Sequence, residues 1–245
     1  MRALVVGASA GVGRALSEAL AERGTALLLV ASDAQDLDAL AAHLRLVYGA
    51  EVQTIAADAA VPAVCVDKIV EAAALFGELD RLYFPIGASR RDDVALLSAG
   101  DSLAILNANL AVVIAITAHF LPKLLARLPQ ARIVGFGSIA AIRGRQTNVV
   151  YSAAKRGLES YFESLRRLAV GSGVLVQFFR LGYVETQQSF GQRLLFAAVT
   201  PKQVADYVLA NSDNDIGARF FPRFWGLIAL AITWLPWPLY KKLNF

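Results

Sequence analysis

The chain has few of the residues that build disulfide and metal sites. Cys65 is its single cysteine among 245 residues, and His43 and His119 are its two histidines. One cysteine excludes an internal disulfide framework and any multi-cysteine metal site. Two histidines without an HExxH pattern argue against a zinc hydrolase. We therefore expect no metal site.

The chain also has little net charge. The chain carries 24 Lys and Arg against 20 Asp and Glu, a net charge of +4, and no Lys/Arg block of the kind that grips nucleic acid. We therefore expect no nucleic-acid partner. Hydrophobic residues make up 56% of the chain, and the mean hydropathy is +0.50, which indicates either a large core or an apolar surface that contacts lipid. No signal-peptide pattern precedes the first apolar run, so we expect a cytoplasmic protein.

Short apolar runs alternate with longer amphipathic runs along the chain. This alternation predicts an α/β fold, a single-domain Rossmann-like doubly wound parallel sheet of about seven strands with flanking helices. We expect a catalytic domain over residues 1–218 and an apolar C-terminal segment over 219–245. Strands are predicted at residues 3–6, 26–31, 52–56, 79–86, 132–136 and 174–179. Helices are predicted at residues 12–23, 35–48, 62–76, 102–128 and 152–170, with a later one starting at Thr200.

A glycine-rich turn follows the first strand and opens the first helix. Its spacing is G-x3-G-x-G, and glycines at these places let the backbone approach a pyrophosphate at the helix N-terminus. The alternative is a tight strand-to-helix connection without a ligand. We expect dinucleotide contacts from Gly7, Ser9, Ala10, Gly11, Val12 and Gly13.

The end of the second strand is the expected place of cofactor choice. Ser32 and Asp33 lie there without an adjacent Arg or Lys, and an acidic group accepts hydrogen bonds from an adenosine ribose. The cofactor is therefore expected to be NAD(H) or NADP(H), with a lean to NAD(H). The alternative is that Asp33 only caps the helix that follows. Asp58 and Ala59, just past the third strand, are placed to contact the adenine.

Tyr151 and Lys155 lie four residues apart at the start of a predicted helix, so they share one face. An ammonium group one turn away, with a cationic nicotinamide nearby, is expected to lower the pKa of the tyrosine toward neutral pH. Ser138, at the end of the fifth strand, is placed to orient a substrate oxygen, and Asn109 to anchor a water that relays protons. The alternative for the Tyr–Lys pair alone is a solvated helix face.

In these motifs and their order, the chain resembles the short-chain dehydrogenase/reductases over nearly its whole length. The resemblance implies that Tyr151 is the acid/base, that Lys155 binds the nicotinamide ribose, that Ser138 positions the carbonyl and that Asn109 holds the relay. The chain departs from the family at residues 85–88, where only Gly87 carries over, and at Leu181, which replaces a proline. Ala10 stands where NADP-binding members often have a basic residue. By the same resemblance, Gly182, Val184 and Thr186 are expected to contact the cofactor from the segment that closes over the nicotinamide.

Two arginines lie between Ser138 and Tyr151. Arg143 and Arg145 are expected to bind a phosphate or carboxylate of the substrate, because guanidinium groups bind such anions bidentately. The alternative is that they are surface or interface arginines. A second charged run, residues 90–93, is interpreted as a solvated loop.

Residues 224–240 contain no charged side chain, and basic residues flank them on both sides. Their three tryptophans favour a segment lying at a membrane interface, and two prolines argue against a spanning helix. The alternatives are a substrate lid or a dimer contact. Arg143, Arg145, Asn148 and Tyr151, with the ending PLYKKL, resemble a bacterial subgroup of the family that includes the decaprenylphosphoryl-ketopentose reductase.

The predicted activity is hydride transfer between nicotinamide and a secondary alcohol or ketone on an apolar or lipid-linked substrate, which the subgroup resemblance suggests could be a phosphosugar. One alternative is a reductase of long-chain 3-keto lipids or steroids. A second, of another class, is a catalytically idle nucleotide-binding or membrane-scaffold protein. We expect a homo-oligomer that is cytoplasmic and peripheral on the inner face of the cell membrane.

Overall fold

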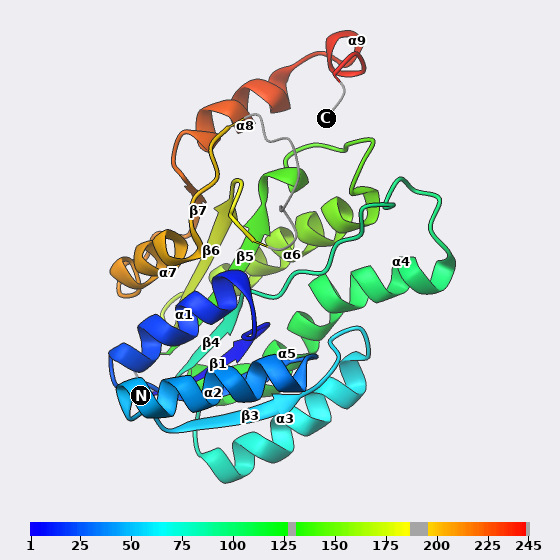
Figure 1. The fold of residues 1–245 in the computed structure, drawn as a ribbon. Helices are drawn as coiled ribbons and strands as arrows, with labels where there is room; N and C mark the ends of the chain where they lie inside the picture. The colour runs from blue at the N-terminus through cyan, green and yellow to red at the C-terminus, as the bar shows by residue number, and fades with distance from the viewer. Residues whose placement is uncertain (127–130, 187–195, 244–245) are drawn as a thin grey trace.

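The computed structural model describes residues 1–126, 131–186 and 196–243. Within them the chain forms a seven-stranded parallel sheet, in the order β3-β2-β1-β4-β5-β6-β7 (Figure 1). This confirms the predicted doubly wound fold. The strands are β1 (Arg2–Val6), β2 (Ala26–Ala31), β3 (Val52–Ala56), β4 (Arg81–Phe84), β5 (Arg132–Ser138), β6 (Leu175–Leu181) and β7 (Ala218–Phe221).

The central strands are apolar throughout because helices cover both of their faces. Leu4 of β1 pairs in register with Leu28 of β2 and with Leu82 of β4, and all three are fully buried. The chain crosses from β1 outward to β3 and then returns to β4 on the other side of β1. Such a switch in strand order opens a crevice at the carboxyl ends of the strands, where ligands bind in this class of fold.

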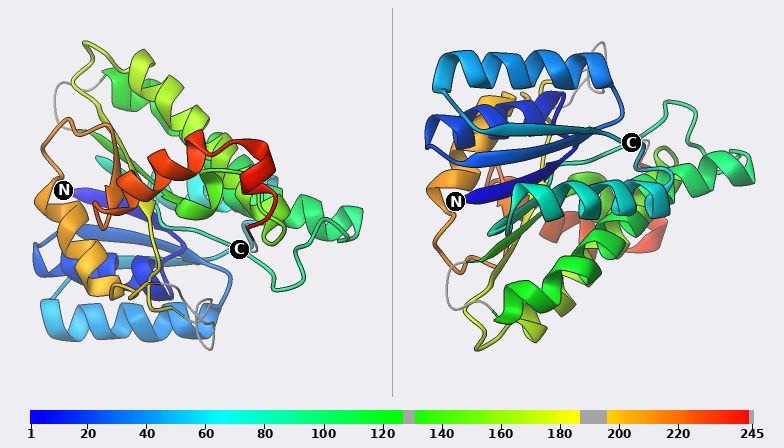
Figure 2. Two further views of the ribbon diagram at one scale, coloured as in Figure 1. Left: turned by 90° about the horizontal axis from the view of Figure 1, so that it is seen from above. Right: turned by 90° about the horizontal axis from the view of Figure 1, so that it is seen from below.

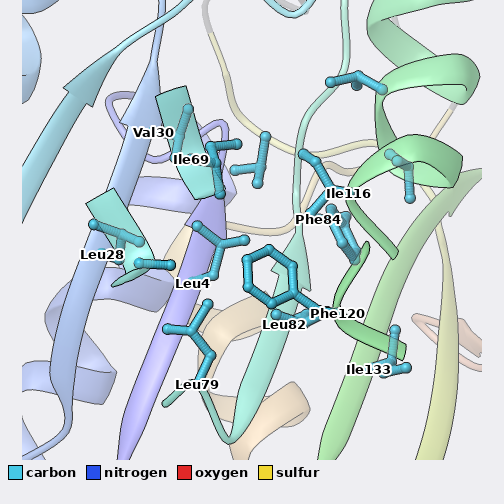
Figure 3. Packing of buried hydrophobic residues seen from close by; sticks show 14 of the residues in the cluster. Leu4, Leu28, Val30, Ile69, Leu79, Leu82, Phe84, Ile116, Phe120 and Ile133 are labelled. Carbon is cyan, nitrogen blue, oxygen red and sulfur yellow. The ribbon is translucent and has the colours of Figure 1, made fainter. Parts of the chain in front are cut away.

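Two layers of helices enclose the sheet (Figures 1 and 2). Buried side chains of α1 (Gly11–Glu22), α2 (Ala34–Tyr48) and α7 (Pro201–Ala210) pack on one face. Those of α3 (Pro62–Phe76), α5 (Val112–Ala126) and α6 (Val149–Leu168) pack on the other. Figure 3 shows the second cluster, in which Ile69 and Phe120 lie near Leu4, Leu28 and Leu82.

The long helix predicted at residues 102–128 is three consecutive elements, and its predicted end lies outside the described residues. They are α4 (Ala99–Leu106), the π-helical turn η1 (Asn107–Ala111) and α5. Within the described residues this is the one helix long and apolar enough to cross a membrane by length and composition. Val113, Ile116 and Phe120 bury one of its faces in the core, as expected for the core helix of an α/β domain.

The C-terminal region departs most from the predicted elements. The sequence did not locate β7, which is short and only partly buried and lies at the edge of the sheet. The structure places residues 218–221 inside the sheet as β7, so the segment outside the sheet begins after them. Two helices follow, α8 (Trp225–Trp234) and α9 (Trp237–Tyr240). In Figure 1 they lie beyond the ends of β5 and β6.

Candidate active site

A cleft of about 910 Å³ lies at the carboxyl ends of the central strands. Its volume is near the upper end of the roughly 300–1,000 Å³ typical of ligand sites. Gly13, Asp33, Asn109 and Arg143 are the predicted site residues that do not line it. Those that do are Gly7, Ser9, Ala10, Gly11, Val12, Ser32, Asp58, Ala59, Gly87, Ser138, Arg145, Tyr151, Lys155, Gly182, Val184 and Thr186.

The glycine turn forms one wall of the cleft and has the geometry of an anion site. Gly7 has a φ of +90°, and a Cβ there would lie 2.8 Å from the Cα of Ile86. A Cβ on Gly13 would lie 1.8 Å from the carbonyl oxygen of Gly7. Ala10 precedes α1 and makes no side-chain hydrogen bond to its first turn. That turn can therefore direct backbone N–H donors at a phosphate, which fits a dinucleotide.

Asp33 caps the helix that follows it, which was the alternative to a role in cofactor binding. Its Oδ1 accepts a hydrogen bond of 2.9 Å from the Asp36 N–H and so caps α2. It is exposed and does not line the cleft. The lean to NAD(H) that rested on Asp33 therefore has no support from the geometry. Asp58 does line the cleft, while its Oδ1 accepts from the Ala60 N–H at 2.8 Å.

Lys155 reaches from α6 into the floor of the cleft. Its Nζ donates to the carbonyl oxygens of Ile86, at 2.8 Å, and Phe136, at 3.1 Å, so it joins the ends of β4 and β5. The residue is 3% exposed. Burial penalises the ammonium form and lowers the pKa of Lys155 to about 7.

Tyr151 lies one helical turn before Lys155, whose Nζ is 5.9 Å from the tyrosine ring centroid. Burial raises the pKa of Tyr151, and a side-chain hydrogen bond with Ser138 opposes that rise. Without the cofactor, burial therefore outweighs the lowering of the Tyr151 pKa that the sequence predicts with a cationic nicotinamide nearby, and that prediction stays a prediction. The reason is that desolvation disfavours the phenolate, while Lys155 Nζ donates to backbone carbonyl oxygens. Tyr151 and Ser138 can together hold a single substrate oxygen.

Asn109 lies in η1 and is fully buried. Its amide nitrogen donates to the carbonyls of Ala88, at 2.7 Å, and Ile105, at 2.9 Å, and its Oδ1 accepts from the Ala88 N–H at 3.2 Å. A Cβ on Gly87 would lie 3.7 Å from Lys155 Nζ and 3.8 Å from Asn109 Oδ1. The Asn109 side chain thus holds the segment after β4 beside Lys155, and its predicted role of anchoring a relay water stays a prediction.

The structure separates the two arginines. Arg143 donates to the carbonyls of Ile232, at 2.8 Å, and Leu235, at 2.5 Å, and stacks over the Tyr240 ring at 3.9 Å. It therefore caps the C-terminal end of α8, and it lines a neighbouring cavity without lining the cleft itself. Arg145 lines both the cleft and that cavity.

The sequence did not reveal this second cavity, which has a volume of about 90 Å³. It shares Ile139, Arg145 and Tyr183 with the cleft, so it extends that cleft under α8. No local sequence pattern predicts this cavity, because residues that follow β5 and residues of α8, far apart in the chain, line it together. The other lining residues are Ile142, Arg143, Phe196, Trp225, Ile228, Ile232 and Tyr240.

Residues 90–93 are not simply a solvated loop, as the sequence had indicated. Asp93 is fully buried, and its carboxylate accepts hydrogen bonds from the backbone of α6 beside Tyr151. The sequence RRDD does not indicate that Asp93 is buried while the other three residues are exposed, because a run of charged residues is typical of a solvated loop. An aspartate that caps a helix far along the chain leaves no signal at that helix.

Comparisons with known proteins agree with this geometry. A sequence profile of the short chain dehydrogenase family matches residues 1–193. The chain is 28% identical over 187 residues to the 3-oxoacyl-(acyl-carrier-protein) reductase FabG of Escherichia coli, covering 76% of this chain and 75% of that protein. It is 29% identical over 216 residues to the ketoacyl reductase HetN of a Nostoc species, covering 86% and 75%.

Solved structures share the fold. A short-chain dehydrogenase from Sphingobium yanoikuyae in complex with NADPH has a TM-score of 0.83 at 22% identity, covering 99% of this chain and 96% of that one. Another from Burkholderia cenocepacia, in complex with NADP, has a TM-score of 0.79 at 26% identity, covering 89% and 95%. The chain is therefore a member of the short chain dehydrogenase family, an oxidoreductase that acts on CH–OH and keto groups with a nicotinamide cofactor, NAD(P).

Proposed function

We propose that the protein interconverts a ketone and a secondary alcohol, with Tyr151 as the acid/base. The observation that carries this proposal is that Tyr151, Ser138 and Lys155 line one cleft with the glycine turn. In reduction, the ketone carbon accepts the hydride that nicotinamide supplies, and the Tyr151 hydroxyl donates a proton to the ketone oxygen. Ser138 orients that oxygen. The intact triad argues against an idle nucleotide-binding or scaffold protein.

The cofactor contacts belong to the same proposal. The glycine turn and the N-terminus of α1 bind the pyrophosphate, Asp58 and Ala59 contact the adenine, and Lys155 holds the nicotinamide ribose. Asn109 acts indirectly, because it fixes the segment of Gly87 beside Lys155. The family relatives from Sphingobium and Burkholderia carry NADPH and NADP, so both phosphorylated and unphosphorylated cofactors have to be titrated.

We further propose that the ketone carries an apolar chain, which occupies the cavity under α8. The lining of this cavity is mostly isoleucine and aromatic side chains, which favours burial of hydrocarbon. The names of the two relatives, a 3-oxoacyl reductase and a ketoacyl reductase, support a long-chain 3-keto lipid as the second candidate substrate. Arg145, at the junction of the two spaces, is placed to hold a substrate anion such as a phosphate.

Filling this cavity should remove the preference for long chains. Ile228→Trp is expected to raise KM for a long-chain ketone about tenfold, the loss of roughly 1.4 kcal/mol of apolar burial, while kcat/KM for a short ketone stays within about twofold. The measurement is a chain-length series with NADH and with NADPH. Leu227→Trp is the matched control, because Leu227 is next to Ile228 in the chain but is 75% exposed and does not line the cavity. Equal KM values for long and short ketones in the unmodified protein would contradict the proposal.

A membrane-facing role for the C-terminal helices is also part of the proposal. Their outer face exposes Leu227, Leu230 and Trp234 on α8 and Trp237 and Leu239 on α9. Basic residues flank this apolar face and residues 219–245 contain no acidic residue, which matches an anionic lipid surface. An apolar or lipid-linked ketone could then reach the cavity from the inner face of the cell membrane. The predicted homo-oligomer stays a prediction.

Sedimentation with lipid vesicles tests this role. The protein should pellet with vesicles containing phosphatidylglycerol, bind less at high salt, and bind pure phosphatidylcholine weakly. Leu230→Glu with Trp234→Glu should abolish pelleting and leave turnover of a short soluble ketone within about twofold, because both side chains point away from the cleft. If the unmodified protein stays in the supernatant with all vesicles, the outer face is a dimer contact or lid surface.

A further inference from the structure

Asp93 is a fully buried carboxylate in the segment that joins β4 to α4. Its Oδ1 accepts a hydrogen bond of 3.0 Å from the Val150 N–H, and its Oδ2 accepts one of 2.9 Å from the Tyr151 N–H. The backbone carbonyl of Asp93 also accepts from the Val149 N–H at 3.4 Å. One residue thus receives the first three N–H groups of α6, from more than fifty positions earlier in the chain.

The start of α6 depends on this distant partner. Asn148 occupies the N-cap position in the left-handed region, with a φ of 56°, and its side chain makes no cap hydrogen bond. The N–H groups of a first helical turn have no partner within the helix. A carboxylate is favoured there because the helix dipole is positive at its N-terminus. Asp93 therefore does for α6 what a local Ser or Asp does for most helices.

The same short segment holds both members of the Tyr–Lys pair. The Ile86 carbonyl accepts from Lys155 Nζ, and Asp93 accepts from the backbone of Tyr151. Between them, Asn109 holds Ala88. Three residues before Asp93, the guanidinium of Arg90 pairs with Asp101, which ties this segment to α4. The turn of α6 that carries the chemistry is therefore clamped from one side.

We propose that Asp93 is a positioning residue that sets the first turn of α6 so that the Tyr151 hydroxyl stays at Ser138. This inference rests on the proposed role of Tyr151. Asp93 acts only through the backbone, since its carboxylate oxygens face N–H groups. An asparagine would keep one acceptor oxygen and set an NH₂ donor against the other N–H. The turn must then shift, and a displacement of about 1 Å at a reacting group costs up to about 10²-fold in rate.

The test compares Asp93→Asn with Asp92→Asn, its exposed neighbour. Asp93→Asn is expected to lower kcat about 10- to 100-fold, with KM and the dissociation constants of NADH and NADPH within about threefold. Asp92→Asn should leave kcat within about twofold. In a Tyr151→Phe background, Asp93→Asn should cause no further loss of the residual rate, because the hydroxyl that it positions is gone.

The outcomes separate the two proposals. A kcat within twofold of the unmodified enzyme, or an equal loss with and without the Tyr151 hydroxyl, would overturn the positioning role. Loss of cofactor binding, or failure of both Asp93→Asn and Asp93→Ser to fold by circular dichroism, would assign Asp93 to stability and also overturn it. If Tyr151→Phe itself keeps full turnover, the proposed function fails instead.

Discussion

Replacing Tyr151 with phenylalanine is expected to lower kcat by about 10³-fold or more, while NADH and NADPH bind as before. A positioned general acid contributes roughly 10²–10⁴-fold to a rate, and the Tyr151 side chain interacts with Ser138, the residue proposed to orient the ketone oxygen. The glycine turn and Lys155 stay in place, so the cofactor site is intact. Steady-state kinetics and cofactor fluorescence titration measure the two effects separately.

Tyr161→Phe provides the matched control. Tyr161 lies on the same helix, packs against the core and does not line the cleft, so loss of its hydroxyl should leave kcat unchanged. The pH dependence of ketone reduction is a second test of Tyr151 as the proton donor. Because the pKa of Tyr151 is raised, its proton is present at neutral pH. Ketone reduction should therefore stay fast at neutral pH and fall as pH rises through that raised pKa. Full turnover by Tyr151→Phe would sink the mechanism.

Gly13→Ala is expected to abolish cofactor binding and to destabilise the fold by about 3 kcal/mol or more. Helix propensity alone predicts the opposite, since alanine is favoured over glycine inside a helix by about 1 kcal/mol. A steric overlap makes the substitution destabilising here. The new Cβ would lie 1.8 Å from the Gly7 carbonyl oxygen, and this partner is backbone, so no side-chain rotation relieves the overlap. Overpacking in a buried site costs about 1–3 kcal/mol or more, and the turn proposed to bind the pyrophosphate must open.

Isothermal titration with NADH and NADPH, together with denaturant unfolding, measures both expected losses. Gly144→Ala is the control, because a Cβ on Gly144 meets nothing within 4 Å, although the residue lies between Ser138 and Tyr151. It should bind cofactor and unfold like the unmodified protein. Unchanged cofactor affinity in Gly13→Ala would show that the glycine turn is only a strand-to-helix connection, the alternative that its sequence left open.

Local patterns in the sequence were sufficient for most of the sheet. The predicted strands at residues 26–31 and 52–56 agree with β2 and β3 residue for residue, and the predicted helix at 62–76 agrees with α3. Continuous apolar runs and capping residues are short-range signals, so they can be recognised in the sequence without knowledge of the fold. The spacing of Ser138, Tyr151 and Lys155 likewise identified the family that the profile match confirms.

Other residues were decided by the tertiary structure alone. Arg143 and Arg145 are two positions apart and chemically identical, yet the first closes α8 and the second lines the cleft. Their sequence context could not distinguish them, because the deciding partners, such as Ile232, lie about 90 residues away. The strand β7 was missed for the same reason, since an edge strand takes its place from its neighbour β6 and not from its own pattern.

The sequence by itself therefore determined the fold class, the family and the Ser138, Tyr151 and Lys155 side chains that line one cleft, because periodicity and motif spacing are local properties of the chain. The tertiary structure decided which of the charged and polar residues serve the site and which serve the scaffold. Asp33 caps α2, Asn109 holds Ala88, and Asp93, part of an apparently solvated run, lies buried under Tyr151. A side chain's role depends on the donors and acceptors that folding brings to it, and those partners come from distant parts of the chain.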